Sequence, residues 1–190
     1  MMEIYAKALS GDADAQCELG KALLAGEQVE EDDAEAAKYL LMSARQGNAD
    51  AQYCIGSLYR EGVGVERSDE EAFGWFLKSA EQGDPDAQYN LGKQYELGEG
   101  TGVSMGDAFA WFHRSAEQGI ADAMYMVAIM TALGEGTDAD ADEAVRWMRR
   151  SSQAGSPAAR DVISRMKGND KCQVIREYAT EYRAAMSRRG

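Results

Sequence analysis

The 190-residue sequence predicts an all-α fold built from helix-turn-helix repeats of 36 residues. The first observation behind this prediction is a set of glycines at a constant spacing of 36 residues: Gly11, Gly47, Gly83, Gly119 and Gly155. The second is an alanine four residues after each of these glycines, followed four residues later by an aliphatic side chain. The third is that both halves of each unit place their small and apolar residues at helical spacing.

Each unit is predicted to hold two helices. In the third unit, Ala87 and Leu91 share one face of the first helix. The second helix carries a stripe at i, i+3, i+4, i+7 and i+8, which is wide enough for burial: Ala108, Trp111, Phe112, Ser115 and Ala116. Because the equivalent stripes contain Trp75 and Trp147, all three tryptophans are expected in the core and not on a stacking platform.

Residues that favour helix ends recur at the same places. The second helices are predicted to begin at a capping Asp or Ser with an acid three residues later: Asp32, Ser68, Ser104 and Asp140. Glycines that suit the left-handed position after a helix are predicted to end the first helices: Gly26, Gly62, Gly98 and Gly134. A glycine inside a helix costs about 1 kcal/mol, so the mid-helix Gly20, Gly56 and Gly92 predict close approach of a second helix.

The tetrapeptide ADAQ, at 13–16 and again at 49–52, is either a repeated functional site or a repeated helix start. The residues before it favour a helix start, since most are good N-caps: Asp12, Asn48, Asp84 and Ser156, with Ile120 as the exception. Its glutamines, Gln16, Gln52 and Gln88, have no role that the sequence explains.

The period divides the chain into six segments of one predicted solenoid domain. They are an N-terminal cap helix in 1–10, repeats at 11–46, 47–82, 83–118 and 119–154, and a degenerate repeat in 155–190. The last segment lacks the interhelix loop and the tryptophan, so 171–188 is predicted to be a C-terminal capping helix.

Charge is distributed unevenly along this chain, whose formal net charge is −13. Residues 1–143 hold 9 Lys/Arg against 29 Asp/Glu, whereas residues 144–190 hold 11 against 4. An acidic body repels phosphate, which argues against nucleic acid as a partner. No apolar run approaches the roughly 18–20 residues of a membrane span. The start lacks a basic flank followed by an apolar stretch, so no secretory signal is expected.

Cysteine and histidine usage predicts a cytoplasmic protein without a metal or other cofactor. The three cysteines form no CxxC motif, which suits reduced thiols, and one histidine cannot supply a multi-His metal site. No spacing suggests a nucleophile paired with a base, so we expect no enzyme.

The segments GNADAQYCIGSLYREGVGVERSDEEAFGWFLKSAEQG and GDPDAQYNLGKQYELGEGTGVSMGDAFAWFHRSAEQG resemble the Sel-1-like repeat, a relative of the tetratricopeptide repeat. The resemblance covers residues 11–154 and implies a right-handed α/α superhelical solenoid whose first helices line a concave groove used in protein–protein adaptor work. One branch of the family carries a disulfide in each repeat and is exported. This chain lacks such cysteine pairs, so neither trait transfers.

The groove implied by the resemblance would be lined by a column of tyrosines at one repeat position, namely Tyr53, Tyr89 and Tyr125. Tyrosine anchors protein interfaces well, but these rings could equally seal adjacent repeats, and both interpretations stay open here. Their expected groove neighbours are Ser57, Arg60, Lys93, Glu96 and Lys21, with Ile129 and Ala132 beside Tyr125. Tyr59 and Tyr95 occupy core positions of the family pattern.

The predicted function is a non-enzymatic scaffold or adaptor that binds a partner peptide or helix in the groove. A basic segment fits the acidic body, and a monomer without membrane contact is expected. The alternative is a dedicated inhibitor or immunity-type protein that blocks one enzyme. Homo-association between the basic C-terminal end and an acidic neighbour is a further alternative.

Overall fold

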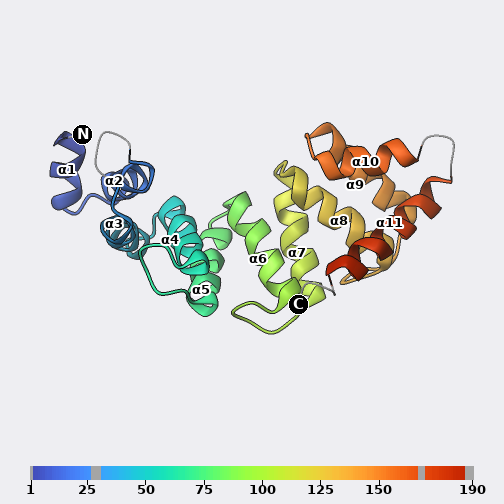
Figure 1. The fold of residues 1–190 in the computed structure, drawn as a ribbon, viewed down its shortest axis with the longest axis horizontal. Coiled ribbons are helices and arrows are strands. Elements are labelled where there is room, and N and C mark those ends of the chain that lie inside the picture. Colours follow the sequence, from blue (N-terminus) through green and yellow to red (C-terminus); the bar gives the residue numbers. More distant parts are fainter. Residues whose placement is uncertain (1, 27–30, 167–169, 187–190) are drawn as a thin grey trace. The chain divides into compact units, whose positions relative to one another are not determined.

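The computed structural model describes residues 2–26, 31–166 and 170–186, and within them the chain forms eleven α-helices and no strand (Figure 1). The helices fall into two compact units, one of residues 1–94 and 98–102 and one of residues 95–97 and 103–190. The two units are described separately below.

The first unit contains the N-terminal helix and the helix pairs of the first repeats. Its helices are α1 (Met2–Leu9), α2 (Ala13–Ala25), α3 (Asp33–Arg45), α4 (Ala49–Glu61), α5 (Asp69–Glu81) and α6 (Pro85–Leu97), of which the last turn belongs to the second unit. In repeats 1 and 2, the second helix packs on the first helix of its own repeat, and α3 packs also on α4 of the next.

The second unit contains α7 (Met105–Glu117), α8 (Ala121–Leu133), α9 (Ala141–Gln153), α10 (Pro157–Arg165) and α11 (Lys171–Met186). The predicted capping helix over 171–188 is therefore α11, with 187 and 188 outside the described residues. It does not continue the stacking of second helices, since it packs mainly on α8 and α9 and only lightly on α10 (Figure 1).

The helix ends follow the predicted caps. The side chains of Asp12, Asn48 and Asp84 accept a hydrogen bond from the backbone N–H three residues on, at 2.7–2.9 Å, whereas Ile120 provides no such bond. Asp32, Ser68, Ser104 and Asp140 cap the second helices in the same way. The predicted glycines follow the first helices in the left-handed conformation: Gly26, Gly62, Gly98 and Gly134. ADAQ is thus a helix start.

The mid-helix glycines allow two helices to approach closely. A Cβ atom at Gly20 would lie 2.6 Å from Cγ of Leu40 and 3.1 Å from the carbonyl oxygen of Ala36. One at Gly56 would lie 3.0 Å from the ring of Phe76. The predicted close approach is confirmed at both positions.

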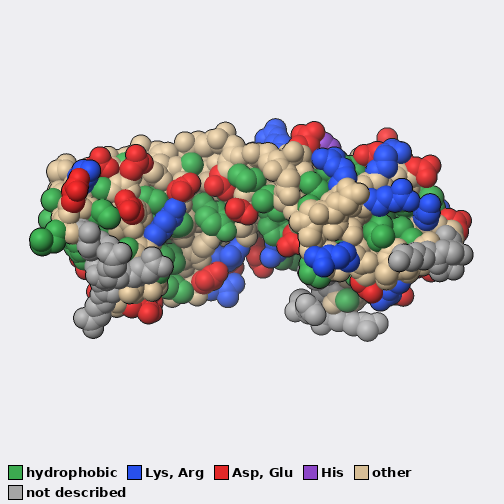
Figure 2. Space-filling model, turned by 90° about the horizontal axis from the view of Figure 1, so that it is seen from above, with side chains coloured by type: hydrophobic (Ala, Val, Ile, Leu, Met, Phe, Trp, Pro, Cys, Tyr) green, Lys and Arg blue, Asp and Glu red, His purple; other side chains and the backbone are tan. Residues whose placement is uncertain are grey.

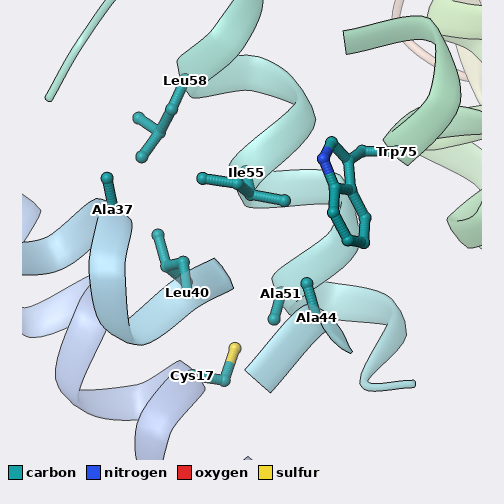
Figure 3. Close-up of a cluster of buried hydrophobic side chains, with 8 residues drawn as sticks. All are labelled: Cys17, Ala37, Leu40, Ala44, Ala51, Ile55, Leu58 and Trp75. Carbon is teal, nitrogen blue, oxygen red and sulfur yellow. The ribbon is translucent and has the colours of Figure 1, made fainter. Parts of the chain in front are cut away.

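The core of the first unit joins side chains from four helices. Figure 3 shows side chains of α2, α3, α4 and α5 converging on one buried cluster, made of Cys17, Ala37, Leu40, Ala44, Ala51, Ile55, Leu58 and Trp75. Tyr59 packs against this cluster as a partly buried neighbour, in line with its predicted core position. Because α3 contributes Leu40 between two first helices, neither repeat buries its apolar face alone.

The tryptophans are not equally buried. Trp75 and Trp147 are 8% and 5% exposed, as expected for the core. Trp111 is only half-buried, so it lies at the edge of the core in which the sequence placed it. Its ring is covered by Arg114, whose guanidinium carbon lies 4.4 Å from the ring centroid, in a cation–π contact.

Buried glutamines, which the sequence left unexplained, connect consecutive helices. The side-chain amide of Gln52 donates to the carbonyl of Ala44 at 3.1 Å, and its oxygen accepts from Gln82 at 2.7 Å. Gln16 makes the same two bonds, to the carbonyl of Ala8 and from Gln46. We call this arrangement the glutamine relay. The glutamine is a second donor to a carbonyl that also accepts from a backbone N–H of the following turn, and its bonds join three successive helices.

Candidate protein-binding surface

The first helices of the first unit carry most of the predicted groove residues on one face. We call it the first-helix face, and define it by Cys17, Lys21, Tyr53, Ser57, Arg60, Tyr89 and Lys93. Tyr53 on α4 is half-buried, with its ring centroid 5.8 Å from that of Phe76. Burial raises the pKa of its phenol, and the nearby carboxylate of Asp86 acts in the same direction. Tyr89 on α6 is also half-buried, with Nζ of Lys93 6.0 Å from its ring centroid.

Two of the three basic residues expected in the groove, Lys21 and Arg60, form ion pairs within the first unit. Nζ of Lys21 on α2 lies 2.9 Å from a carboxylate oxygen of Asp50 on α4. The guanidinium of Arg60 on α4 donates to the side-chain oxygen of Asn90 on α6 and also pairs with Glu61. Both cations therefore bridge neighbouring helices, and their charge is partly compensated.

Exposed carboxylates surround the first-helix face. Asp14, Glu18, Asp50 and Asp86 are exposed. A depression of about 220 Å³ between α2 and the start of α4 is lined by Asp14, Cys17, Glu18, Lys21, Asn48 and Asp50. A larger one of about 490 Å³ is lined by Glu3, Ile4, Lys7, Asp12, Asp14, Ala15 and Glu18. Acidic groups outnumber basic ones around both, so the electrostatic potential around these depressions is negative.

The surroundings of Asp84 raise the pKa of its carboxyl. Burial raises the pKa of its carboxyl above the usual range, and the carboxylates of Asp86 and Asp50 add to the effect.

Figure 2 shows acidic side chains as the main charged groups over the N-terminal helices on the drawn face, whereas Lys and Arg gather over the C-terminal helices.

The structure places Tyr125 and Glu96, both in the second unit, in surroundings that the sequence did not predict. Tyr125 on α8 is only 7% exposed, because Tyr178 and Tyr182 of α11 lie edge-on to it at centroid distances of 6.4 and 5.8 Å. Glu96 accepts from the guanidinium of Arg183. Both residues are thus occupied by α11, and the expectation that Tyr125 stands free in a groove is wrong for this structure.

Two features of the sequence indicated that the outer face of α8 is covered. At the positions where α4 has Ser57 and Arg60, α8 has the apolar Ile129 and Ala132, both buried. The basic composition of residues 144–190 was the second signal. Neither feature indicated which segment would cover α8.

The described residues show no feature of a metal centre or a membrane span. Among residues 2–26, 31–166 and 170–186, no group of three or more His, Cys, Asp or Glu side chains could hold a metal ion. In the same ranges, no helix has the length and apolar character that crossing a bilayer requires.

The arrangement of helix pairs at a 36-residue period agrees with comparisons to known proteins. The Sel1 repeat pattern matches residues 13–48, 49–84, 85–120 and 121–156, which together make up more than half of the chain. This chain belongs to the Sel1 repeat family. The matched repeats begin two residues after the boundaries expected from the glycine period.

Solved structures of Sel1 repeat proteins are similar to the chain. A protective antigen present in uropathogenic Escherichia coli strains, which displays an SLR fold, is 32% identical with a TM-score of 0.80 over 83% of this chain. A Sel1 repeat protein from Oxalobacter formigenes is 30% identical with a TM-score of 0.79 over 87% of it. The matched regions span 34% and 48% of those two chains.

A third structure shows the fold alone. Cysteine-rich protein B of Helicobacter pylori is 17% identical with a TM-score of 0.55, over 72% of this chain and 98% of its own. In the Sel1 repeat protein described here, the three cysteines are free thiols. No match was found among curated proteins.

The family defines the class of fold and of function. The Sel1 repeat protein is an all-α solenoid of helix-turn-helix repeats of about 36 residues. Proteins of this family are generally scaffolds for protein–protein interaction and are typically not enzymes.

Proposed function

We propose that this Sel1 repeat protein is a non-enzymatic adaptor whose first-helix face binds a basic peptide or helical segment of a partner protein. The observation that carries the proposal is the combination of half-buried tyrosines with exposed carboxylates on the first helices α2, α4 and α6. Tyr53 and Tyr89 supply rigid area for contact, and Asp14, Glu18 and Asp86 supply negative charge.

The engagement of Lys21 and Arg60 supports a cationic partner. Lys21 pairs with Asp50 and Arg60 pairs with Glu61, so the charge that either offers to an acidic ligand is reduced. A basic segment would meet the remaining carboxylates, which would raise its association rate more than its final affinity. No feature of the described residues favours the dedicated-inhibitor alternative.

The proposal is tested by affinity purification from cells with three variants of the full chain. Tyr53→Ala/Tyr89→Ala removes the aromatic contacts, and Glu18→Lys/Asp86→Lys reverses the charge of two of the carboxylates named above. Glu81→Lys is the matched control, since Glu81 is an exposed acid on the second helix α5. Tyr125 is excluded because it is buried under α11.

We expect at least tenfold lower recovery of the partner with either double variant and no change with Glu81→Lys. Partner recovery should also fall as salt rises, because exposed charges are screened. Equal recovery with wild type and both double variants would contradict the proposal, as would an equal loss with Glu81→Lys.

A further inference from the structure

Helix α8 is the first helix of repeat 4. It differs from α2 and α4, the first helices of repeats 1 and 2, in having no polar face. Every residue from Ala123 to Ala132 is buried, including Tyr125 and Thr131. A helix that is apolar on all sides must be covered on all sides. Within the second unit, α7 and α9 pack on α8, and α11 packs on it as well. The sequence of α8 thus requires an additional helix on its outer face.

The side chains of α11 that meet this surface form a specific pattern. Tyr178 and Tyr182 are one helical turn apart, and both rings contact Tyr125. The hydroxyl of Tyr182 lies 3.5 Å from the sulfur of Met126. The next residue, Arg183, donates through Nε to Glu135 at 2.6 Å and through its guanidinium to Glu96. We call the receiving surface, made of Tyr125, Met126, Glu96 and Glu135, the α8 dock.

The α8 dock demands a cation as well as aromatic rings. The side chain of Glu96 is only 4% exposed and that of Glu135 is 30% exposed. A buried carboxylate without a positive partner is strongly unfavourable. Burial alone would lower the pKa of Arg183, but the two carboxylates outweigh it and raise the pKa, so the guanidinium stays charged. A purely apolar helix could not replace α11.

Helix α11 is attached to the rest of the second unit through few buried side chains. Among residues 171–185 of α11, whose side chains are described, only Ile175 and Ala179 are fully buried, while Arg176, Glu177, Thr180 and Glu181 are exposed. Its contacts with the preceding helix α10 are few, so it is held mainly by α8 and α9. These features are those of a bound amphipathic helix in a groove.

We propose that the α8 dock is a binding site for an amphipathic partner helix carrying two aromatic residues four positions apart followed directly by arginine, and that α11 is its internal occupant. The partner helix displaces α11, because the two compete for the same tyrosine and the same two carboxylates. This site goes beyond the proposed function, which concerns the first-helix face of the other unit. The tests below use no cellular partner, so either proposal can fail without the other.

The first test measures hydrogen exchange in the wild-type full chain. We expect the amides of residues 174–183 in α11 to exchange at least tenfold faster than those of residues 144–151 in α9, because α11 opens locally. Exchange of α11 and α9 at one common rate would make α11 an integral part of the fold and would overturn the proposal.

The second test uses a fluorescent peptide of residues 170–186 as the probe helix. Its affinity is measured by anisotropy for the wild-type full chain and for the full chain with Tyr182→Ser and Arg183→Glu, which releases α11. We expect binding at least tenfold tighter to the released chain, because the internal occupant no longer competes. A peptide with Arg183→Glu should bind at least tenfold more weakly, and one with Arg176→Glu, at an exposed position, should bind unchanged.

Two outcomes of the peptide assay overturn the proposal, provided that circular dichroism shows the released chain to be folded. One is absence of peptide binding to the released chain. The other is an equal loss of affinity for the Arg176→Glu and Arg183→Glu peptides. Light scattering decides the remaining case: a wild-type dimer that Arg183→Glu dissociates would assign the dock to α11 of a second copy and overturn the partner-helix proposal.

Discussion

Replacement of Gly20 by alanine sets two opposite effects against each other. Alanine favours the helical state of α2 by about 1 kcal/mol over glycine. The added Cβ atom, however, would lie 2.6 Å from Cγ of Leu40 and 3.1 Å from the carbonyl oxygen of Ala36. Carbon atoms pack best at about 3.5–4.0 Å, and Leu40 is 0% exposed, so its side chain has no free space to move into.

The steric effect should win at this position. Overpacking of a core costs about 1–3 kcal/mol, and an overlap of about 1 Å with the branch atom of Leu40 places Gly20→Ala in the upper half of that range. After the gain in helix propensity, we expect a net loss of about 1–2 kcal/mol in the free energy of unfolding.

Gly74→Ala is the matched control, because Gly74 is also inside a helix but a Cβ there would meet nothing within 4 Å. This variant should gain about 0.5–1 kcal/mol. Urea unfolding followed by circular dichroism measures both changes. The explanation by close helix approach is refuted if Gly20→Ala raises the unfolding midpoint as Gly74→Ala does.

Three further predictions follow from burial and hydrogen bonding. Phe112→Ala should destabilise the chain by about 3–5 kcal/mol, because Phe112 is 0% exposed. Trp111→Ala should destabilise it by clearly less, because Trp111 is half-buried. Equal urea midpoints for the two variants would contradict this order. Gln52→Leu should cost about 1–3 kcal/mol in the same assay, because it removes two side-chain hydrogen bonds, one to the carbonyl of Ala44 and one from Gln82. An unchanged midpoint would remove any stabilising role from the relay. Burial raises the pKa of Cys54 to about 11, so at pH 8 only about one in a thousand of its thiols is thiolate. Native Cys54 should therefore react with a thiol reagent much more slowly than the denatured chain does, and faster as pH approaches 11; equal native and denatured rates at pH 8 would argue against its burial.

The repeated part of the fold was predictable because each repeat supplies independent copies of the same local signals. Capping residues such as Asp12 and Asn48, and the mid-helix Gly20, report on contacts that lie within one or two helices. The position of a helix start is fixed by hydrogen bonds over three residues, which the local sequence contains.

The candidate binding surfaces were predictable only in part. The sequence identified Tyr53 and Tyr89, but it could not show that Arg60 is taken up by Asn90 or that Tyr125 is covered. Those contacts join residues 30 or more positions apart, and the contact of α11 with α8 breaks the period instead of following it. A repeat pattern predicts the contacts that recur, and it carries no information on one that occurs once.

The glutamine relay has a consequence for how such a chain can grow. Gln16 and Gln52 each donate to a carbonyl of the helix before them and accept from the glutamine that follows the next helix, so the first two repeats share one pattern of bonds at a spacing of 36 residues. Duplication of 36 residues within these two repeats would leave each donor with an acceptor. Gain or loss of a length that is not a multiple of 36 residues would strand one of them. The hydrogen bonds that join the repeats therefore also determine the unit in which the gene can lengthen or shorten without loss of the fold.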